Sequence, residues 1–396
     1  MPGSFTQTDS VFSLTTDAFD FKFDDEAVTI LGSVFLESKT LLGVSSNGHS
    51  NQSLINNGVV ISDNNTAVDL DGPNASVLNA TTGLVSGLIF GIDFIGTGFQ
   101  SVNNLGQIIG SIGAGIQFEF GSFTMSNHGS ILSLSVGLEV DQSGGGAINN
   151  FGLIRASSLG SVGIRVFSFL SSAVTNIING HTGIISGGSY AIEDVFGIIS
   201  LSNHGKIFGG IRDFANVSNV VINRGGLIQG LTQLGGGNDL FRGTGGRSGP
   251  VFGDDGNDRL IGGSHNDQLH GGDGNDKLTG GLGADQFFFD TAVNGSFDKI
   301  TDFTPSQRDK IMLSATYFLG VTSVGGKLGG GEFHVGTTAS NPNQHILYNP
   351  NNGFLYYDQD GSGTTFAPIH FATIGNHAAL QAANIHVTNG SFLVEA

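Results

Sequence analysis

The acidic residues between positions 234 and 288 have the type and spacing of a metal-binding repeat. Five nine-residue segments place glycines at a turn, an aspartate after them and an apolar residue two positions beyond the aspartate. Glycine permits a backbone with positive φ, and a carboxylate is a hard oxygen ligand of the kind that calcium prefers. A Gly/Asp-rich linker would have no reason to repeat the apolar position. The pattern therefore predicts stacked turns that bind calcium.

The candidate ligands are the repeated aspartates, the glycines that open the turns and two further turn aspartates. They are Asp239, Gly253, Asp255, Asp258, Gly262, Asp267, Gly271, Asp273, Asp276, Gly280 and Asp285. A degenerate copy at residues 244–252 carries Gly249 where the aspartate should stand, and His265 replaces a turn glycine. The apolar eighth position of each segment is expected to enter the core. It is occupied by Phe241, Leu260, Leu269, Leu278 and Phe287.

This nonapeptide resembles the Gly-Gly-x-Gly-x-Asp repeat of RTX (repeats-in-toxin) proteins, which forms a calcium-binding parallel β-roll. The resemblance implies that each nonapeptide is half a coil and that about two to four calcium ions lie between turns n and n+2. It pairs Asp258 with Asp276 and Asp267 with Asp285. Asp239 can stack with Asp258 only if the extra Gly243 is absorbed at a turn.

A longer repeat, of 20 to 29 residues, precedes the acidic one. An apolar residue stands two positions before its anchor asparagine, and neighbouring segments alternate with the period of two that strands require. Stacked asparagines can exchange amide hydrogen bonds and tolerate left-handed backbone at a turn, so a structural role is favoured over a ligand role. The anchors are Asn56, Asn79, Asn104, Asn127, Asn150, Asn179, Asn203 and Asn223.

Three short strands per repeat, with the same positions apolar in every copy, predict an all-β protein. The expected fold is a right-handed parallel β-helix that continues into the RTX β-roll and ends in a β-rich cap. Its Asn-x-Gly-x-Ile coil resembles the β-helical regions of bacterial autotransporters and adhesins. The expected domains are lead-in strands at 1–52, the β-helix at 53–233, the β-roll at 234–288 and the cap with an export signal at 289–396.

The segment after Phe287 resembles the C-terminal domain of serralysin-like proteases and other RTX proteins exported by type I systems. The likeness is carried by Asp298-Lys-Ile-Thr-Asp-Phe, Asp309-Lys-Ile-Met-Leu and Gly353-Phe-Leu-Tyr-Tyr-Asp-Gln-Asp-Gly. In that family the domain caps the solenoid and holds an uncleaved signal near the terminus. The resemblance therefore implies a signal at the apolar, acid-tipped end from Phe392 to Ala396.

One loop in this segment matches the start of an EF-hand calcium loop. Asp358, Asp360, Ser362 and Gly363 fill its first, third, fifth and sixth positions, but Ile369 replaces the glutamate expected at the twelfth. A hairpin turn is therefore favoured over a calcium site.

Composition limits the partners and the compartment. A formal net charge of −18 disfavours nucleic acid and anionic lipid surfaces and favours a divalent cation. Without cysteine, a secreted form must be held by packing and metal instead of disulfides. Residues 1–10 lack a basic and apolar leader, and no apolar run is long enough for a membrane span. We therefore expect type I export to the exterior or surface of a Gram-negative cell.

Two function classes suit the β-helix. The favoured one is a non-catalytic adhesin, matrix or surface-layer component that binds polysaccharide or associates with itself, so no catalytic residue is assigned. The alternative is a polysaccharide lyase, epimerase or glycoside hydrolase, whose candidate site is a column of polar residues on one strand face. That column contains Asp69, Asp93, Gln117, Glu139, Arg165, Glu193 and Arg212.

The chemistry of this column argues against an enzyme. Asp69 and Asp93 could form the carboxylate pair of a glycoside hydrolase, but solvent-facing strand positions give little burial to raise a carboxyl pKa, and only the adjacency of the two charges would raise it. No Lys or Arg lies between Lys39 and Arg155 to neutralise a uronate, and the H-E-x-x-H motif of serralysins is absent. Arg165 is expected to form exterior ion pairs with its two acidic neighbours in the column.

Overall fold

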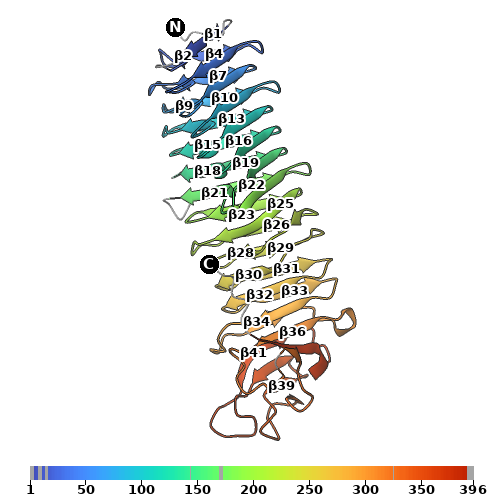
Figure 1. Cartoon of the computed structure of the whole chain (residues 1–396). Coiled ribbons are helices and arrows are strands. Elements are labelled where there is room, and N and C mark those ends of the chain that lie inside the picture. Colours follow the sequence, from blue (N-terminus) through green and yellow to red (C-terminus); the bar gives the residue numbers. More distant parts are fainter. Residues whose placement is uncertain are drawn as a thin grey trace. The chain divides into compact units, whose positions relative to one another are not determined.

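The structure is a computed structural model that describes residues 4–7, 11–13, 17–142, 144–168, 173–323 and 325–389. The chain divides into two compact units, residues 1–215 with 226–230 and residues 216–225 with 231–396. Both consist of short strands that pair mainly in parallel (Figure 1). The helices among the described residues are two 3-10 turns, η1 (Pro305–Gln307) and η2 (Ala382–Asn384). The predicted all-β parallel solenoid is confirmed.

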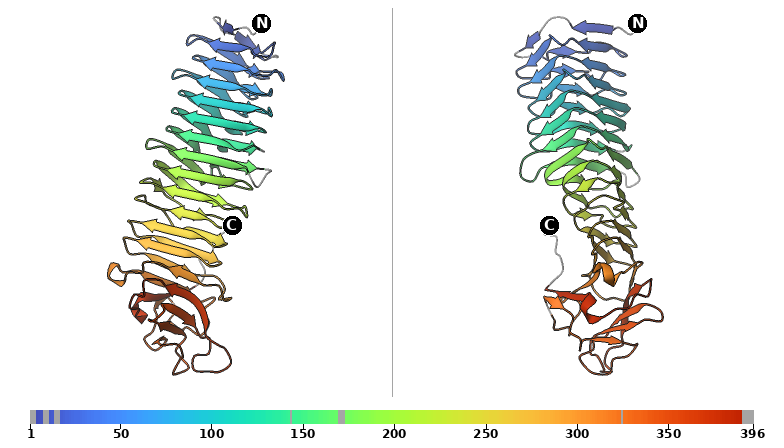
Figure 2. Two further views of the ribbon diagram at one scale, coloured as in Figure 1. Left: turned by 180° about the vertical axis from the view of Figure 1, so that it is seen from behind. Right: turned by 90° about the vertical axis from the view of Figure 1, so that its right-hand side faces the viewer.

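In the first unit, successive coils add strands to three stacked lines, which we name lines A, B and C (Figure 2). Line A consists of β1 (Ser4–Gln7), β4 (Ala27–Ile30), β7 (Ser53–Asn56), β10 (Ser76–Asn79), β13 (Phe99–Asn104), β16 (Ser122–Asn127), β19 (Gly146–Asn150), β22 (Val174–Asn179) and β24 (Ile198–Asn203). Line B consists of β2 (Val11–Ser13), β5 (Phe35–Ser38), β8 (Val59–Ser62), β11 (Leu84–Gly87), β14 (Gln107–Gly110), β17 (Ser130–Ser133) and β20 (Leu153–Ala156). Line C consists of β3 (Phe19–Asp20), β6 (Val44–Ser45), β9 (Val68–Leu70), β12 (Ile92–Phe94), β15 (Ala114–Glu119), β18 (Val136–Gln142) and β21 (Val162–Ser168).

Lines B and C merge in the later coils of this unit. The long strand β23 (Ile184–Asp194) pairs first with β20 and then with β21, and β25 (Lys206–Asp213) pairs along it. The short strand β27 (Leu227–Ile228) adds to β25. The pairing is in parallel register from coil to coil, so one position of the repeat forms one column.

The core of the first unit follows from this register. Alternate side chains point inward along each strand, and the apolar residue two positions before each ladder asparagine is almost completely buried. On line A this column contains Leu54, Val77, Val102, Met125, Ile148, Ile177 and Leu201, each at most 2% exposed. The apolar column predicted from the repeat is therefore a continuous core.

The predicted asparagine ladder is confirmed in the first unit. Seven buried asparagines, from Asn56 to Asn203, pass amide hydrogen bonds from coil to coil at Nδ2 to Oδ1 distances of 2.8–2.9 Å. Each is 0% exposed. The expectation of left-handed backbone is wrong, because none of these asparagines has a positive φ. Close stacking instead constrains the next turn residue: a Cβ on Gly106 would lie 2.2 Å from the carbonyl oxygen of Gly83.

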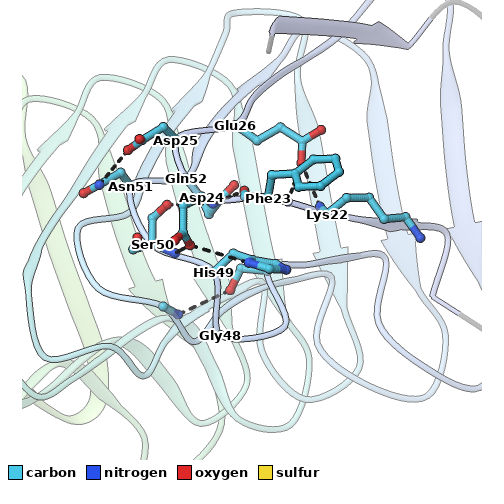
Figure 3. A network of polar contacts seen from close by, with 12 residues as sticks. Lys22, Phe23, Asp24, Asp25, Glu26, Gly48, His49, Ser50, Asn51 and Gln52 are labelled. Atoms are coloured by element: carbon cyan, nitrogen blue, oxygen red, sulfur yellow. Dashed lines mark hydrogen bonds and ion pairs between the residues drawn. The ribbon is translucent and has the colours of Figure 1, made fainter. Parts of the chain in front are cut away.

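Polar contacts also tie successive coils at the corner between lines C and A (Figure 3). The N–H of Ser50 donates to Asp24 over 2.8 Å, and the Asn51 amide donates to Asp25 over 2.7 Å. Gln52 donates its amide to the carbonyl of Phe23 over 2.9 Å. These bonds satisfy backbone and side-chain groups that the strands leave unpaired at the turn.

The coils of the second unit are shorter and have two lines. One contains β26 (Val220–Asn223), β29 (Leu240–Arg242), β31 (Arg259–Gly263), β33 (Lys277–Gly281) and β35 (Asp298–Ile300). The other contains β28 (Thr232–Gln233), β30 (Val251–Asp255), β32 (Gln268–Asp273), β34 (Gln286–Phe289) and β36 (Lys310–Ser314).

Strands from the end of the chain cover the last coil of this unit. β41 (Ile369–Ile374) adds in parallel to β35, and β42 (Ile385–Thr388) adds in parallel to β36. β40 (Phe354–Tyr357) pairs with β41, and β39 (Ile346–Asn349) pairs with β40, both in antiparallel order. The remaining short strands are β38 (Phe333–Val335), beside β39, and β37 (Gly326–Lys327), beside β42. This arrangement pairs a solenoid edge that would otherwise be open to association.

We predict that Asn104→Ala destabilises the first unit by about 1–3 kcal/mol, because it leaves buried amide groups of Asn79 and Asn127 short of a partner. Urea denaturation measures the change. Asn103→Ala is the matched control, since Asn103 is the neighbouring, exposed residue on the same strand. Equal effects of the two substitutions would contradict a structural role for the ladder.

Candidate calcium-binding site

The nonapeptides of the second unit fold as half coils, as predicted. Alternate nonapeptides form neighbouring strands, so that Leu260 lies beside Leu278 and Leu269 lies beside Phe287. The five apolar residues at the eighth position are at most 1% exposed. They fill the interior of the coils and thereby fix the turns that carry the aspartates.

The turns bring the repeated aspartates together in two columns. The N–H of Asp258 donates to Oδ1 of Asp276 over 2.8 Å, and the N–H of Asp267 donates to Oδ1 of Asp285 over 2.9 Å. The N–H of Asp239 likewise donates to Oδ1 of Asp258 over 2.7 Å. Gly243 is absorbed at the turn, where its N–H reaches the carbonyl of Ile261. All three predicted pairs of aspartates are therefore adjacent. We call these columns the aspartate ladder.

The second carboxylate oxygen of four ladder residues is buried and has no hydrogen-bond partner. These are the Oδ2 atoms of Asp258, Asp267, Asp276 and Asp285. Each oxygen faces the glycine that opens its own nonapeptide, where an added Cβ would lie 2.1–2.4 Å from it. The four glycines are Gly253, Gly262, Gly271 and Gly280.

Backbone carbonyls converge on the same places. The point where Gly253 would carry a Cβ lies 2.4 Å from the carbonyl oxygen of Gly271, and the equivalent point at Gly262 lies 2.6 Å from that of Gly280. Carboxylate and carbonyl oxygens are the ligands that calcium takes in proteins. The residues present therefore fit a calcium ion, and a side chain on any of these glycines would fill the space.

The two remaining predicted ligands lie elsewhere on the turns. Asp255 and Asp273 are exposed and stand beside one another at the ends of β30 and β32. Their backbone carbonyls accept hydrogen bonds from the N–H groups of Gly237 and Gly256. Their negative charges contribute to raising the pKa of the ladder residues Asp258 and Asp276, after the larger effect of burial.

The ladder extends beyond the residues that the repeat predicted. The N–H of Asp276 donates to Oδ1 of Asp298 over 3.0 Å, and the N–H of Asp285 donates to Oδ1 of Asp309 over 3.1 Å. Asp302 accepts the N–H groups of Gly280 and Gly281. The missed signal is the Asp-Lys-apolar triplet, which occurs at 276, 298 and 309, whereas the insertions between the triplets break the period of nine.

Burial and mutual repulsion disfavour the ionised ladder in the absence of a cation. Burial is the largest cause in each case and raises the pKa of Asp258 and Asp267 to about 7 and that of Asp285 to about 6. Neighbouring carboxylates add to the effect: Asp276 acts on Asp258, and Asp285 acts on Asp267. A cation would reverse this balance by favouring the charged form.

The sequence of this site was compared with known protein families. Residues 252–287 match the RTX calcium-binding nonapeptide repeat. The match comprises four copies. Searches of curated proteins and of solved structures returned no match. The protein is thus a calcium-binding RTX β-solenoid protein.

The RTX site has few side-chain ligands. No group of three or more His, Asp or Glu side chains in the described part of the chain is placed to hold a metal ion. The carbonyl oxygens of Gly271 and Gly280 lie beside the paired aspartates and could complete the coordination of calcium in the RTX repeats. Within the same described residues, no helix is long and apolar enough to cross a membrane.

The polar column of the first unit lies on line C. Its members are in register: Asp69 pairs with Asp93, Asp93 with Gln117, and so on to Glu193 and Arg212. The predicted ion pairs are present, at 3.6 Å from Arg165 to Glu139 and 2.9 Å from Arg165 to Glu193. Arg212 donates instead to the hydroxyl of Tyr190.

The expectation that this column faces solvent is wrong at Asp93 and Gln117, which are only 6% and 8% exposed. Neighbours one strand spacing away flank each side chain and withdraw it from water. Burial first, and the charge of Asp69 second, raise the pKa of Asp93 to about 8. Burial also raises the pKa of Asp69 to about 6. One oxygen of each carboxyl group is buried without a hydrogen-bond partner.

We predict that the calcium-free second unit becomes more stable as the pH falls. The folded-state pKa values of about 6–7 exceed the ordinary 3.8, so the folded ladder binds more protons than the unfolded chain in this range. Stability in chelator should be lost as the pH rises through about 6–7 and regained toward pH 4. Thermal unfolding followed by circular dichroism measures this, and each kcal/mol shifts the melting temperature by about 2–4 °C.

The same thermal unfolding experiment is repeated in saturating calcium for comparison with chelator. Saturating calcium favours the ionised carboxylates, so it should restore folding at pH 8, and its affinity should fall as protons compete at lower pH. A melting temperature at pH 8 that chelation leaves unchanged would contradict this account of the ladder.

Proposed function

We propose that the protein leaves a Gram-negative cell through a type I secretion system and folds outside when calcium occupies the aspartate ladder. The observation that carries this proposal is the row of buried, unpartnered carboxylate oxygens in the RTX repeats. Such a row opposes folding until a cation neutralises it, so that binding free energy becomes folding free energy. Extracellular calcium modules bind at about 10⁻⁴–10⁻³ M, far above cytosolic calcium, and the chain would stay unfolded until export.

We further propose that the first unit acts at the cell surface as a non-catalytic adhesin, matrix or surface-layer component. The outward side of line A between β7 and β19 supports this role, because the side chains that line it are uncharged hydroxyl, amide and aliphatic groups. A shallow groove crosses it from β7 to β19, lined in part by Ser53, Ser76, Ser101, Thr124 and Asn149. Polar groups repeated at the strand spacing suit an extended polysaccharide or a second copy of the chain.

Export is tested by truncation. The proposed signal at residues 392–396 lies outside the described residues, and we expect deletion of residues 340–396 to leave the protein in the cytoplasm. Immunoblots of cells and medium measure the distribution. Because this deletion also removes β39 to β42, the same segment is fused to an unrelated reporter, which should then be exported. Secretion of the truncated protein, or retention of the fusion, would contradict a C-terminal signal.

A second candidate function is the cleavage of polysaccharide, and the buried pair Asp69 and Asp93 favours it. Carboxyl groups on neighbouring strands lie at about the 5 Å separation that a retaining glycoside hydrolase uses. Near neutral pH, a pKa of about 8 keeps Asp93 protonated as a proton donor, while a pKa of about 6 leaves Asp69 largely ionised as a nucleophile.

The two functions predict different results with alginate, pectin and bacterial exopolysaccharides. For an adhesin we expect binding without release of products, and Asp69→Asn with Asp93→Asn should cause no loss of turnover. The double substitution should slightly raise the melting temperature, because it removes repulsion between neighbouring strands. Reducing-end assays and calorimetry measure the outcome. Products that disappear in Asp93→Asn, with an unchanged melting temperature, would place the protein among the enzymes.

A further inference from the structure

The loop between β40 and β41, residues 358–368, contains two carboxyl groups outside the RTX repeats. Asp358 directly follows β40 and is only 3% exposed. Its N–H donates to the carbonyl of His345 over 2.8 Å, and its own carbonyl lies 2.9 Å from Nδ1 of His345. The backbone of Asp358 is thereby fixed in the sheet, and its side chain is held at the base of the loop.

Asp360 holds the loop in a closed turn. Its Oδ2 accepts the N–H groups of Thr365, over 2.8 Å, and Phe366, over 3.4 Å. The next residue, Gly361, has a φ of +59° and approaches the carbonyl of Pro342 so closely that a Cβ would lie 2.6 Å from that oxygen. The loop therefore needs glycine here, and it is pressed against residues 341–342.

One oxygen of each carboxyl group lacks a donor from the rest of the protein. Oδ1 of Asp358 and Oδ1 of Asp360 are both buried and without a hydrogen-bond partner. The pKa of Asp358 is raised, by burial first and by the adjacent Asp360 carboxyl second. Among the described residues, no Lys, Arg or His forms an ion pair with either group. Two such oxygens side by side require a cation or a shared proton.

We propose that this loop binds a calcium ion at a site separate from the RTX ladder. Its ligands are the carboxylates of Asp358 and Asp360, the hydroxyl of Ser362 and carbonyl oxygens of the loop backbone. The spacing Asp-x-Asp-x-Ser-Gly supplies the first, third and fifth ligand positions of an EF-hand loop and the glycine at its sixth. Ile369, at the twelfth place, begins β41, so pairing with β40 closes the loop where an EF-hand would use glutamate.

The site links calcium to the strands that cover the last coil. β41 pairs with β35 through Asp298 and Ala372, and Asp298 is itself the last member of one column of the aspartate ladder. An ion in the loop holds β40 and β41 together and so stabilises the strand that lies against this end of the ladder. The inference rests on the proposed function only in that the folded protein meets calcium.

Terbium, which takes calcium sites and is sensitised by nearby tyrosine, tests the proposal in the full-length protein. The chain has no tryptophan, and Tyr356 and Tyr357 directly precede Asp358, whereas no tyrosine lies within the RTX repeats. We expect tyrosine-sensitised emission that calcium displaces. It should be lost in Asp358→Asn with Asp360→Asn, and the number of bound calcium ions measured by calorimetry should fall by one.

Reciprocal variants separate this site from the ladder. Asp267→Asn should weaken calcium-dependent folding of the RTX repeats yet keep the tyrosine-sensitised emission. Asp360→Asn alone should retain the acceptor for Thr365 and Phe366 and still weaken terbium binding about tenfold or more, because it removes one ligand charge. Emission and calcium stoichiometry in both Asp360 variants equal to those of the unmodified protein would overturn the proposal. Loss of calcium-dependent folding of the RTX repeats in Asp267→Asn, with the tyrosine-sensitised emission intact, would support a separate site in the loop.

Discussion

Parallel stacking in register places each side chain beside the same position of the next coil, at a strand spacing of about 4.8 Å. The coils of both units obey this constraint, so a residue suits the repeat only if it tolerates a copy of itself on either side. Apolar residues meet the requirement by forming a continuous core. Asparagine meets it because an amide carries both a donor and an acceptor, and each buried Asn can satisfy the next.

Aspartate cannot meet the same requirement alone, because an ionised carboxylate only accepts hydrogen bonds. In the aspartate ladder the backbone N–H of one coil serves Oδ1 of the next, which leaves Oδ2 facing a glycine. A calcium ion is the group that can satisfy this second oxygen together with the nearby carbonyls. Replacing a neutral amide by a carboxylate in a stacked column thus converts a self-sufficient ladder into one that depends on metal.

The first unit also stacks carboxylates in register, but without the glycine turns. Along line C, Arg165 offsets their repulsion by bridging two acidic neighbours, and the amide of Gln117 donates to Glu119. Among the described residues, Asp69 and Asp93 form no ion pair, and the pKa of Asp93, raised by burial to about 8, indicates that a proton takes the place of a cation there. Metal, counter-charge and proton are therefore three solutions to one geometric problem within a single chain.

The sequence alone determined the coil periods, the columns and the identity of the paired aspartates, because in a solenoid spatial adjacency follows directly from the repeat length. It therefore predicted that Asp258 would lie beside Asp276 and Asn104 beside Asn127. The tertiary structure decided what repeat length does not encode. Asp298 and Asp309 joined the ladder across insertions of irregular length, and Asp93 became buried because the side chains above and below it exclude water. Asp358 and Asp360 came together because pairing of β40 with β41 closes their loop, a contact set by the fold and not by a period.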